Sequence, residues 1–162
     1  KPFTPFQWAP MARPEIVDER IKAVRGAIKS RSIVYNYHEQ ETSFMEAVFA
    51  RGDRRTCDVL IKAFEKGAKF DGWSEYFNME IWNEAMEECN LDSEFYVYRE
   101  REDDEILPWD FIDIGVNRKY MERENEKAKK AELTKNCLEG CTGCGINVNF
   151  KEGKCFEGAI RN

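Results

Sequence analysis

TSFMEAVFARGDRRTCDVLIKAFEKG, residues 42–67, decides the fold, because it contains two amphipathic segments separated by a glycine. On both sides of Gly52 the apolar residues recur at spacings of three and four, which is the pattern of a helix with one buried face. We expect Gly52 to end a first helix over residues 42–50, and Asp53 to cap a second that ends at Gly67. The stretch therefore predicts a tight pair of helices.

Further helices are expected on both sides of this pair. Proline at a first-turn position predicts a helix over residues 14–29, and asparagine caps predict helices over residues 78–90 and 117–133. Residues 32–38, SIVYNYH, alternate and are rich in residues that favour strands, so they predict a short strand. The expected fold class is mainly α, a small helical domain with one or two short strands.

The two ends of the chain differ from this helical middle. Residues 1–13, KPFTPFQWAPMAR, hold three prolines and three large aromatic residues, which predicts an extended segment lying on another domain. Residues 134–162 are rich in glycine and cysteine and have little helical periodicity. The expected organisation is an extended segment over residues 1–13, a helical domain over residues 14–133 and a Cys-rich knuckle over residues 134–162.

Composition limits the classes of function. The 162 residues are 42% hydrophobic and 35% charged, which is typical of a globular protein. A net charge of -6 argues against nucleic-acid binding through the whole surface, although Arg51, Arg54 and Arg55 lie close enough in sequence to form a local basic patch. No apolar run approaches the roughly 20 residues that span a bilayer, and no signal peptide is recognisable. We expect a cytoplasmic protein without membrane contact, and we expect further residues upstream of Lys1.

Cysteines give the sharpest chemical signal. Three of them lie in the run CLEGCTGCG, and the four toward the end of the chain are Cys137, Cys141, Cys144 and Cys155. Interleaved glycines let a backbone fold around one ion, and thiolates are ligands of zinc and of iron–sulfur clusters. The pattern predicts a zinc or iron–sulfur site in a reducing compartment, with Cys155 as the fourth ligand. The alternative is a tail of reduced thiols.

Other candidate residues have weaker patterns. His38 is the only histidine, and it either takes part in catalysis or in binding a ligand or substrate, or forms a structural hydrogen bond. Asp110 and Asp113 form a carboxylate pair whose alternative role is turn capping. Asp71 and Trp73 lie in an aromatic loop that contacts either a substrate or a neighbouring domain.

Five motifs, in order, resemble the C-terminal region of radical SAM (S-adenosylmethionine) proteins that carry a B12-binding domain: KPFTPFQWAPM, TSFMEAVFARGDRRTCDVL, KFDGWSEYFNMEIW, LPWDFIDIGV and ELTKNCLEGCTGCG. The resemblance covers residues 1–147 and implies a cobalamin-type domain and a radical SAM barrel upstream in the same polypeptide. Residues 1–13 would then be the end of that barrel. His38 matches a family position, whereas Asn147 stands where the family has a further cysteine.

The resemblance also implies which cofactors lie elsewhere. The catalytic 4Fe-4S cluster, SAM and cobalamin would belong to the missing upstream domains, so this fragment lacks the catalytic core. The C-x3-C-x2-C spacing of the tail matches the motif that binds the catalytic cluster, but the 18 residues after Cys144 leave no room for a barrel.

Two functions are therefore expected. The first is an accessory region of a radical SAM enzyme that caps the barrel and holds an auxiliary metal or iron–sulfur site. The alternative is a non-catalytic zinc-knuckle adaptor that binds RNA or protein through the arginines and the aromatic loop. A helical domain with free thiols is a third interpretation.

Overall fold

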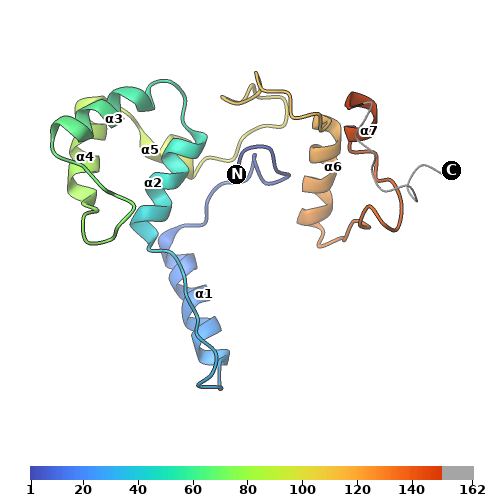
Figure 1. Ribbon diagram of the computed structural model, residues 1–162, viewed down its shortest axis with the longest axis horizontal. Coiled ribbons are helices and arrows are strands. Elements are labelled where there is room, and N and C mark those ends of the chain that lie inside the picture. Colours follow the sequence, from blue (N-terminus) through green and yellow to red (C-terminus); the bar gives the residue numbers. More distant parts are fainter. Residues whose placement is uncertain (151–162) are drawn as a thin grey trace. The chain divides into compact units, whose positions relative to one another are not determined.

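The computed structural model describes residues 1–150 (Figure 1). Over that range it contains seven helices and no strand, which confirms the mainly α class. The helices are α1 (Pro14–Ala27), α2 (Gln40–Arg51), α3 (Thr56–Glu65), α4 (Met79–Glu88), α5 (Ser93–Val97), α6 (Arg118–Lys129) and α7 (Ile146–Asn149). The chain divides into two compact units. One is Ala9–Arg101, and the other combines Lys1–Trp8 with the residues from Glu102 onward.

Three helices, α2, α3 and α4, build the core of the unit formed by residues 9–101. Its buried members are Met45, Val59, Ala63, Trp82, Ala85 and Met86. The predicted helix pair is confirmed, with Gly52 at the end of α2. A Cβ atom on Gly52 would lie 2.7 Å from the Val48 carbonyl oxygen of α2 and would clash with the Thr56 side chain of α3, so the turn between the two helices requires glycine.

The helix caps agree with the sequence at one position and differ at another. Asn78 caps α4, because its side-chain oxygen accepts a hydrogen bond from the Glu80 amide at 2.9 Å. At α3 the cap position is occupied by Arg55 instead of Asp53. Asp53 lies two residues earlier and its carboxylate accepts from the Arg55 amide at 2.9 Å. The expected cap is therefore replaced by a short turn that precedes the helix.

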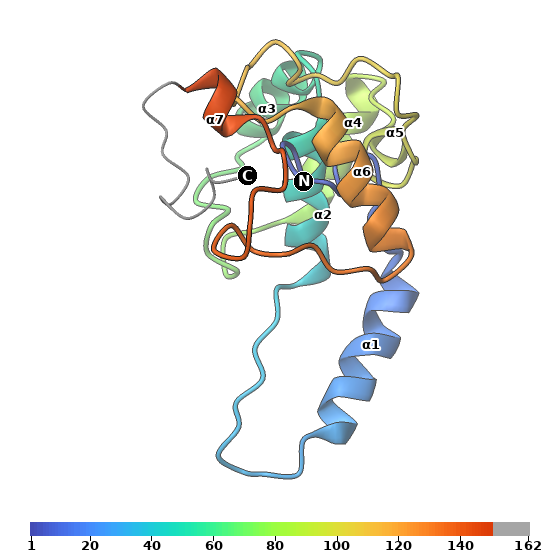
Figure 2. The same cartoon turned by 90° about the vertical axis from the view of Figure 1, so that its right-hand side faces the viewer.

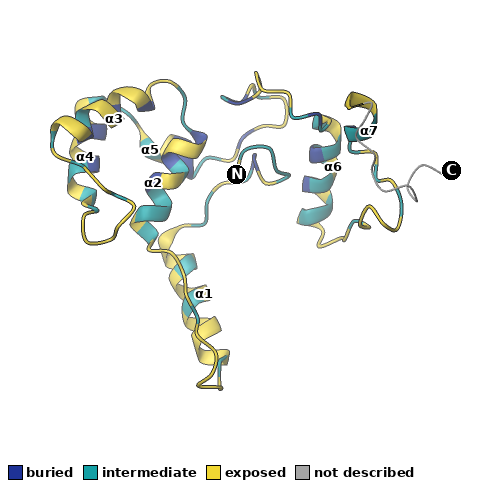
Figure 3. Ribbon diagram, in the orientation of Figure 1, coloured by how far each residue is buried: buried dark blue, intermediate teal, exposed yellow. Residues whose placement is uncertain are grey.

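Helix α1 and the segment that follows it have little core of their own. No residue of α1 is buried (Figure 3). Figure 2 shows the chain leaving the end of α1 and returning to α2 without regular structure. The prediction of a strand over residues 32–38 is wrong, because the structure has no strand at these residues. A strand needs a neighbouring strand to pair with its backbone, and Val34, at 78% exposed, has no covering layer.

The second unit has a separate core around α6. Trp8, Leu107, Trp109 and Met121 are its buried members. Trp109 donates from Nε1 to Gln7 Oε1 at 2.8 Å, so the first residues are tied to this core. Trp8 is thus covered by residues of this chain, whereas Phe6 is 57% exposed. Within the Cys-rich segment, α7 begins after Gly145, a helix that the sequence did not predict.

Candidate functional site

A cavity of about 490 Å³ opens in the unit formed by residues 9–101. This volume lies in the range of sites that bind small molecules, roughly 300–1,000 Å³. Apolar side chains of α1, α2 and α4 form much of its lining, namely Val17, Phe44 and Met79. Polar side chains converge on the same space from several segments, and these are His38, Gln40, Glu41, Ser43, Asn83, Ser93 and Glu94.

His38 reaches this cavity because it stands two residues before α2 begins. Its side chain is exposed toward solvent, while the first turn of α2 places Glu41 on the same cavity. The site therefore combines polar side chains with an apolar wall, which suits a small molecule that has both apolar and polar parts.

Tyr98 lines the cavity and packs against neighbouring side chains. The Arg13 guanidinium lies 4.4 Å from the centre of its ring and pairs with Glu94 at 3.3 Å. The ring of Phe44 packs at 5.8 Å from that of Tyr98. Burial raises the pKa of the Tyr98 phenol, which keeps the hydroxyl protonated and able to donate a hydrogen bond.

The three arginines near the turn between α2 and α3 do not form one exposed patch. Arg51 is 7% exposed and donates to the carbonyl oxygens of Val97 at 3.2 Å and Ala9 at 2.8 Å. Arg55 pairs with Asp53 at 2.6 Å, and this hydrogen bond lowers the pKa of Asp53 to about 2. Arg54 is exposed. Each arginine thus has a different environment.

The carboxylate pair of the second unit makes turn contacts. Asp110 accepts from the Leu107 amide at 2.8 Å and pairs with Arg118 at 3.0 Å. Asp113 accepts from the Gly115 amide at 2.7 Å. Both carboxylates also line a hollow of about 280 Å³ beside Trp109. The turn-capping role accounts for their hydrogen bonds.

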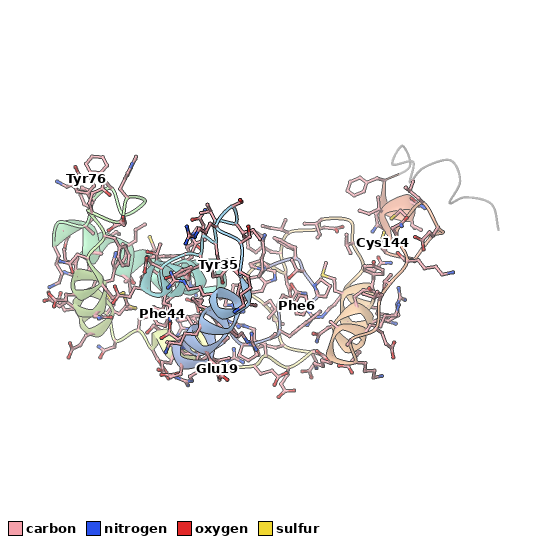
Figure 4. All side chains as sticks on the ribbon, turned by 90° about the horizontal axis from the view of Figure 1, so that it is seen from below. Phe6, Glu19, Tyr35, Phe44, Tyr76 and Cys144 are labelled. Atoms are coloured by element: carbon pink, nitrogen blue, oxygen red, sulfur yellow. The ribbon has the colours of Figure 1, made fainter. Side chains whose placement is uncertain are left out.

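The aromatic loop between α3 and α4 is exposed. Phe70 is 65% exposed, Trp73 58% and Tyr76 59%, and Figure 4 shows Tyr76 projecting outward. The ring of Phe70 lies 6.1 Å from that of Trp73 and 5.9 Å from that of Tyr76. Phe70 adopts a left-handed backbone with φ 61°, a strained conformation for an aromatic residue. Asp71, half-buried in the same loop, has one carboxylate oxygen without a hydrogen-bond partner.

The C-terminal cysteines supply suitable donors but are not gathered around one point. Cys137 and Cys141 are exposed, and Cys144 is half-buried. Among residues 1–150 no group of three or more ligand side chains is arranged to hold a metal ion. Gly140, Gly143 and Gly145 adopt positive φ values of 149°, 74° and 104°. Cys155 lies outside the described residues.

No family model, curated protein or solved structure matches this chain. In the described part of the chain, no helix has the length and apolar character needed to cross a membrane. His38 was identified from the sequence, but the cavity around it was not. Phe44, Met79 and Tyr98 come from separate helices and turns, and no sequence motif links them.

Proposed function

We propose that this chain is the C-terminal accessory region of a radical SAM enzyme and that it caps the catalytic barrel. The barrel, with its 4Fe-4S cluster, SAM and cobalamin, would lie upstream in the same polypeptide. The support from sequence is the order of the five motifs, which extend over most of the chain. The support from structure is an exposed aromatic surface, which the proposed barrel would cover.

The observation that carries this proposal is the exposed aromatic loop. Phe70, Trp73 and Tyr76 contact one another at the surface while leaving more than half of each side chain exposed. Large aromatic clusters of this kind mark sites of association, because burying them in a neighbour is favourable. The loop is also the position of the motif KFDGWSEYF. The exposed aromatic surface therefore lies within one of the motifs that carry the resemblance.

The cavity gives this accessory region a role in substrate binding. In the proposed assembly, the cavity lined by His38 and Tyr98 forms one wall of the substrate site. His38 and the Tyr98 hydroxyl would orient polar groups of the substrate, and the apolar lining would exclude water. Radical chemistry is supplied by the cofactors, so orientation and exclusion of solvent are the tasks left to this region.

An auxiliary metal or iron–sulfur site at the C-terminal cysteines is the second part of the proposal. The three described cysteines would have to approach one another to bind an ion, since thiolate sulfurs lie about 2.3 Å from zinc. Asn147 lies close to this group, with its Nδ2 3.9 Å from Cys141 Sγ. The glycines between the cysteines give the backbone the freedom for such a rearrangement.

Elemental analysis tests this second part. The protein is purified anaerobically, and iron, acid-labile sulfide and zinc are measured per chain. We expect iron with sulfide, and loss of both in the variant Cys141→Ser. The matched control is Cys57→Ser, because Cys57 is also exposed but lies on α3. Stoichiometric zinc without iron would favour the zinc-knuckle adaptor, and neither metal would contradict an auxiliary site.

Docking through the aromatic loop is tested separately, by measuring self-association of the isolated chain. Trp73→Ser should leave the helix content unchanged, because the side chain is not part of a core, and should lower self-association of the isolated chain. Sedimentation velocity of the two proteins provides the comparison. Unfolding of the variant, or unchanged self-association, would contradict a docking role for the loop.

A further inference from the structure

A run of exposed positive charge lies on the arm. We use this name for residues 20–38, which comprise the second half of α1 and the segment that returns to α2 (Figure 2). The arm contains no Asp or Glu, although the whole chain has a net charge of -6. Its five cationic side chains are Arg20, Lys22, Arg25, Lys29 and Arg31.

These cations face solvent and lack acidic partners. All five residues are exposed, and no ion pair within residues 1–150 involves any of them. Lys22 and Arg25 are three residues apart on α1, so they share one side of the helix. Asp18 and Glu19 lie one turn of α1 before Lys22, and beyond them the segment carries positive charges alone, which create a positive potential. This potential attracts a polyanion.

Aromatic rings accompany the charges. Tyr35 and Tyr37 lie on the returning segment with their ring centres 5.7 Å apart. The Arg25 guanidinium lies 4.9 Å from the centre of the Tyr37 ring and donates to its hydroxyl oxygen at 2.9 Å. This bond ties α1 to the returning segment. The cations of α1 and the tyrosine rings of the returning segment therefore lie together on the arm.

We propose that the arm binds single-stranded RNA. Cations bind phosphates, and tyrosine rings and guanidinium planes stack on bases that are not paired. Unpaired bases are the normal state of RNA loops and ends, whereas bases in a DNA duplex are stacked inside it. Val24, Ile33 and Val34 of the arm are exposed apolar residues, so an anionic membrane is the competing partner that the experiment must separate from RNA. The proposal does not depend on the radical SAM assignment.

The number of cations sets the expected salt dependence. For single strands, the logarithm of affinity falls with the logarithm of salt by about 0.7 for each phosphate contact. Five contacts give a slope of about -3.5, which is a loss of about 100-fold in affinity between 50 and 200 mM salt. Removing two cations should reduce the slope to about -2.

Fluorescence anisotropy with a labelled 12-nucleotide single-stranded RNA of mixed sequence tests the proposal in the full chain. Lys22→Gln with Arg25→Gln should weaken binding and reduce the salt slope. The matched control is Lys119→Gln with Lys130→Gln, which removes the same charge from exposed positions on and beside α6. Circular dichroism should show that both variants keep their helices, because all four side chains are exposed.

Tyr35→Ala separates stacking from charge. It should weaken binding by about fivefold to 100-fold while leaving the salt slope unchanged, since no cation is lost. A structural role alone would not produce this difference. The proposal is overturned by absence of binding at 50 mM salt, by equal losses in the arm variant and its control, or by tighter binding to duplex DNA. Binding to phosphatidylserine vesicles with none to RNA would assign the arm to membranes and overturn it as well.

Discussion

Arg51→Met tests whether a buried arginine holds the unit of residues 9–101 together. Arg51 supplies a hydrogen bond to the Ala9 carbonyl, which would lose this donor, and a second to the Val97 carbonyl. The Val97 carbonyl keeps its bond from the Met11 amide, at 2.9 Å. An unsatisfied buried acceptor costs about 1–3 kcal/mol.

Part of this cost is offset by removing the charge. Burial lowers the pKa of the Arg51 guanidinium, which means that the native state disfavours the cation. Methionine retains the apolar length of the side chain without that penalty. We therefore expect a net loss of about 1 kcal/mol in the free energy of unfolding. For a unit of this size, urea slopes of about 1–1.5 kcal/mol/M convert the loss to a midpoint about 0.8 M lower.

Equilibrium urea unfolding followed by circular dichroism at 222 nm measures the loss. Arg54→Met is the matched control, because Arg54 lies three residues away and is exposed. An exposed substitution of this kind is expected to change the free energy of unfolding by no more than about 0.5 kcal/mol. Hydrogen exchange at the Met11 amide gives a local measure, since its bond to Val97 adjoins Arg51. Equal midpoints for the two variants would refute a structural role for Arg51.

Two further predictions concern acid stability and glycine. Because the folded pKa of Asp53, about 2, lies below its ordinary value of 3.8, its contribution is present above pH 4 and is lost as the pH falls toward 2. Since the partner Arg55 is largely exposed, that contribution is about 1 kcal/mol, and Asp53→Asn should remove it in urea unfolding compared at pH 5 and pH 2.5. Gly52→Ala should destabilise the unit by about 2 kcal/mol through the clash with the Val48 carbonyl. Gly26→Ala, in a helix with open space around it, should stabilise by about 0.5 kcal/mol in thermal melts, and a reversed order of the two variants would contradict both expectations.

Local signals in the sequence were sufficient for most helices. Pro14 begins α1, Gly52 separates α2 from α3 and Asn78 caps α4, because each of these residue types acts through its own backbone or its nearest neighbours. The strand predicted over residues 32–38 failed for the opposite reason. Alternation describes one segment, but a strand exists only where a second segment pairs with it.

The candidate site depends even more on tertiary structure. Arg51 and Arg54 are indistinguishable in sequence, yet one is buried under two carbonyls and the other is exposed. His38 could be selected as the only histidine, whereas Tyr98 joins it only because α5 packs on α2. Which helices pack against one another is determined by the whole core, so it cannot be deduced from the spacing of residues in the sequence.

The coding sequence upstream of Lys1 tests the central claim most directly. If the exposed aromatic loop and the cavity of residues 9–101 serve a catalytic neighbour, the open reading frame should continue upstream into a barrel with its own C-x3-C-x2-C loop. A stop codon in that frame, followed by a start codon next to Lys1, would contradict the accessory role.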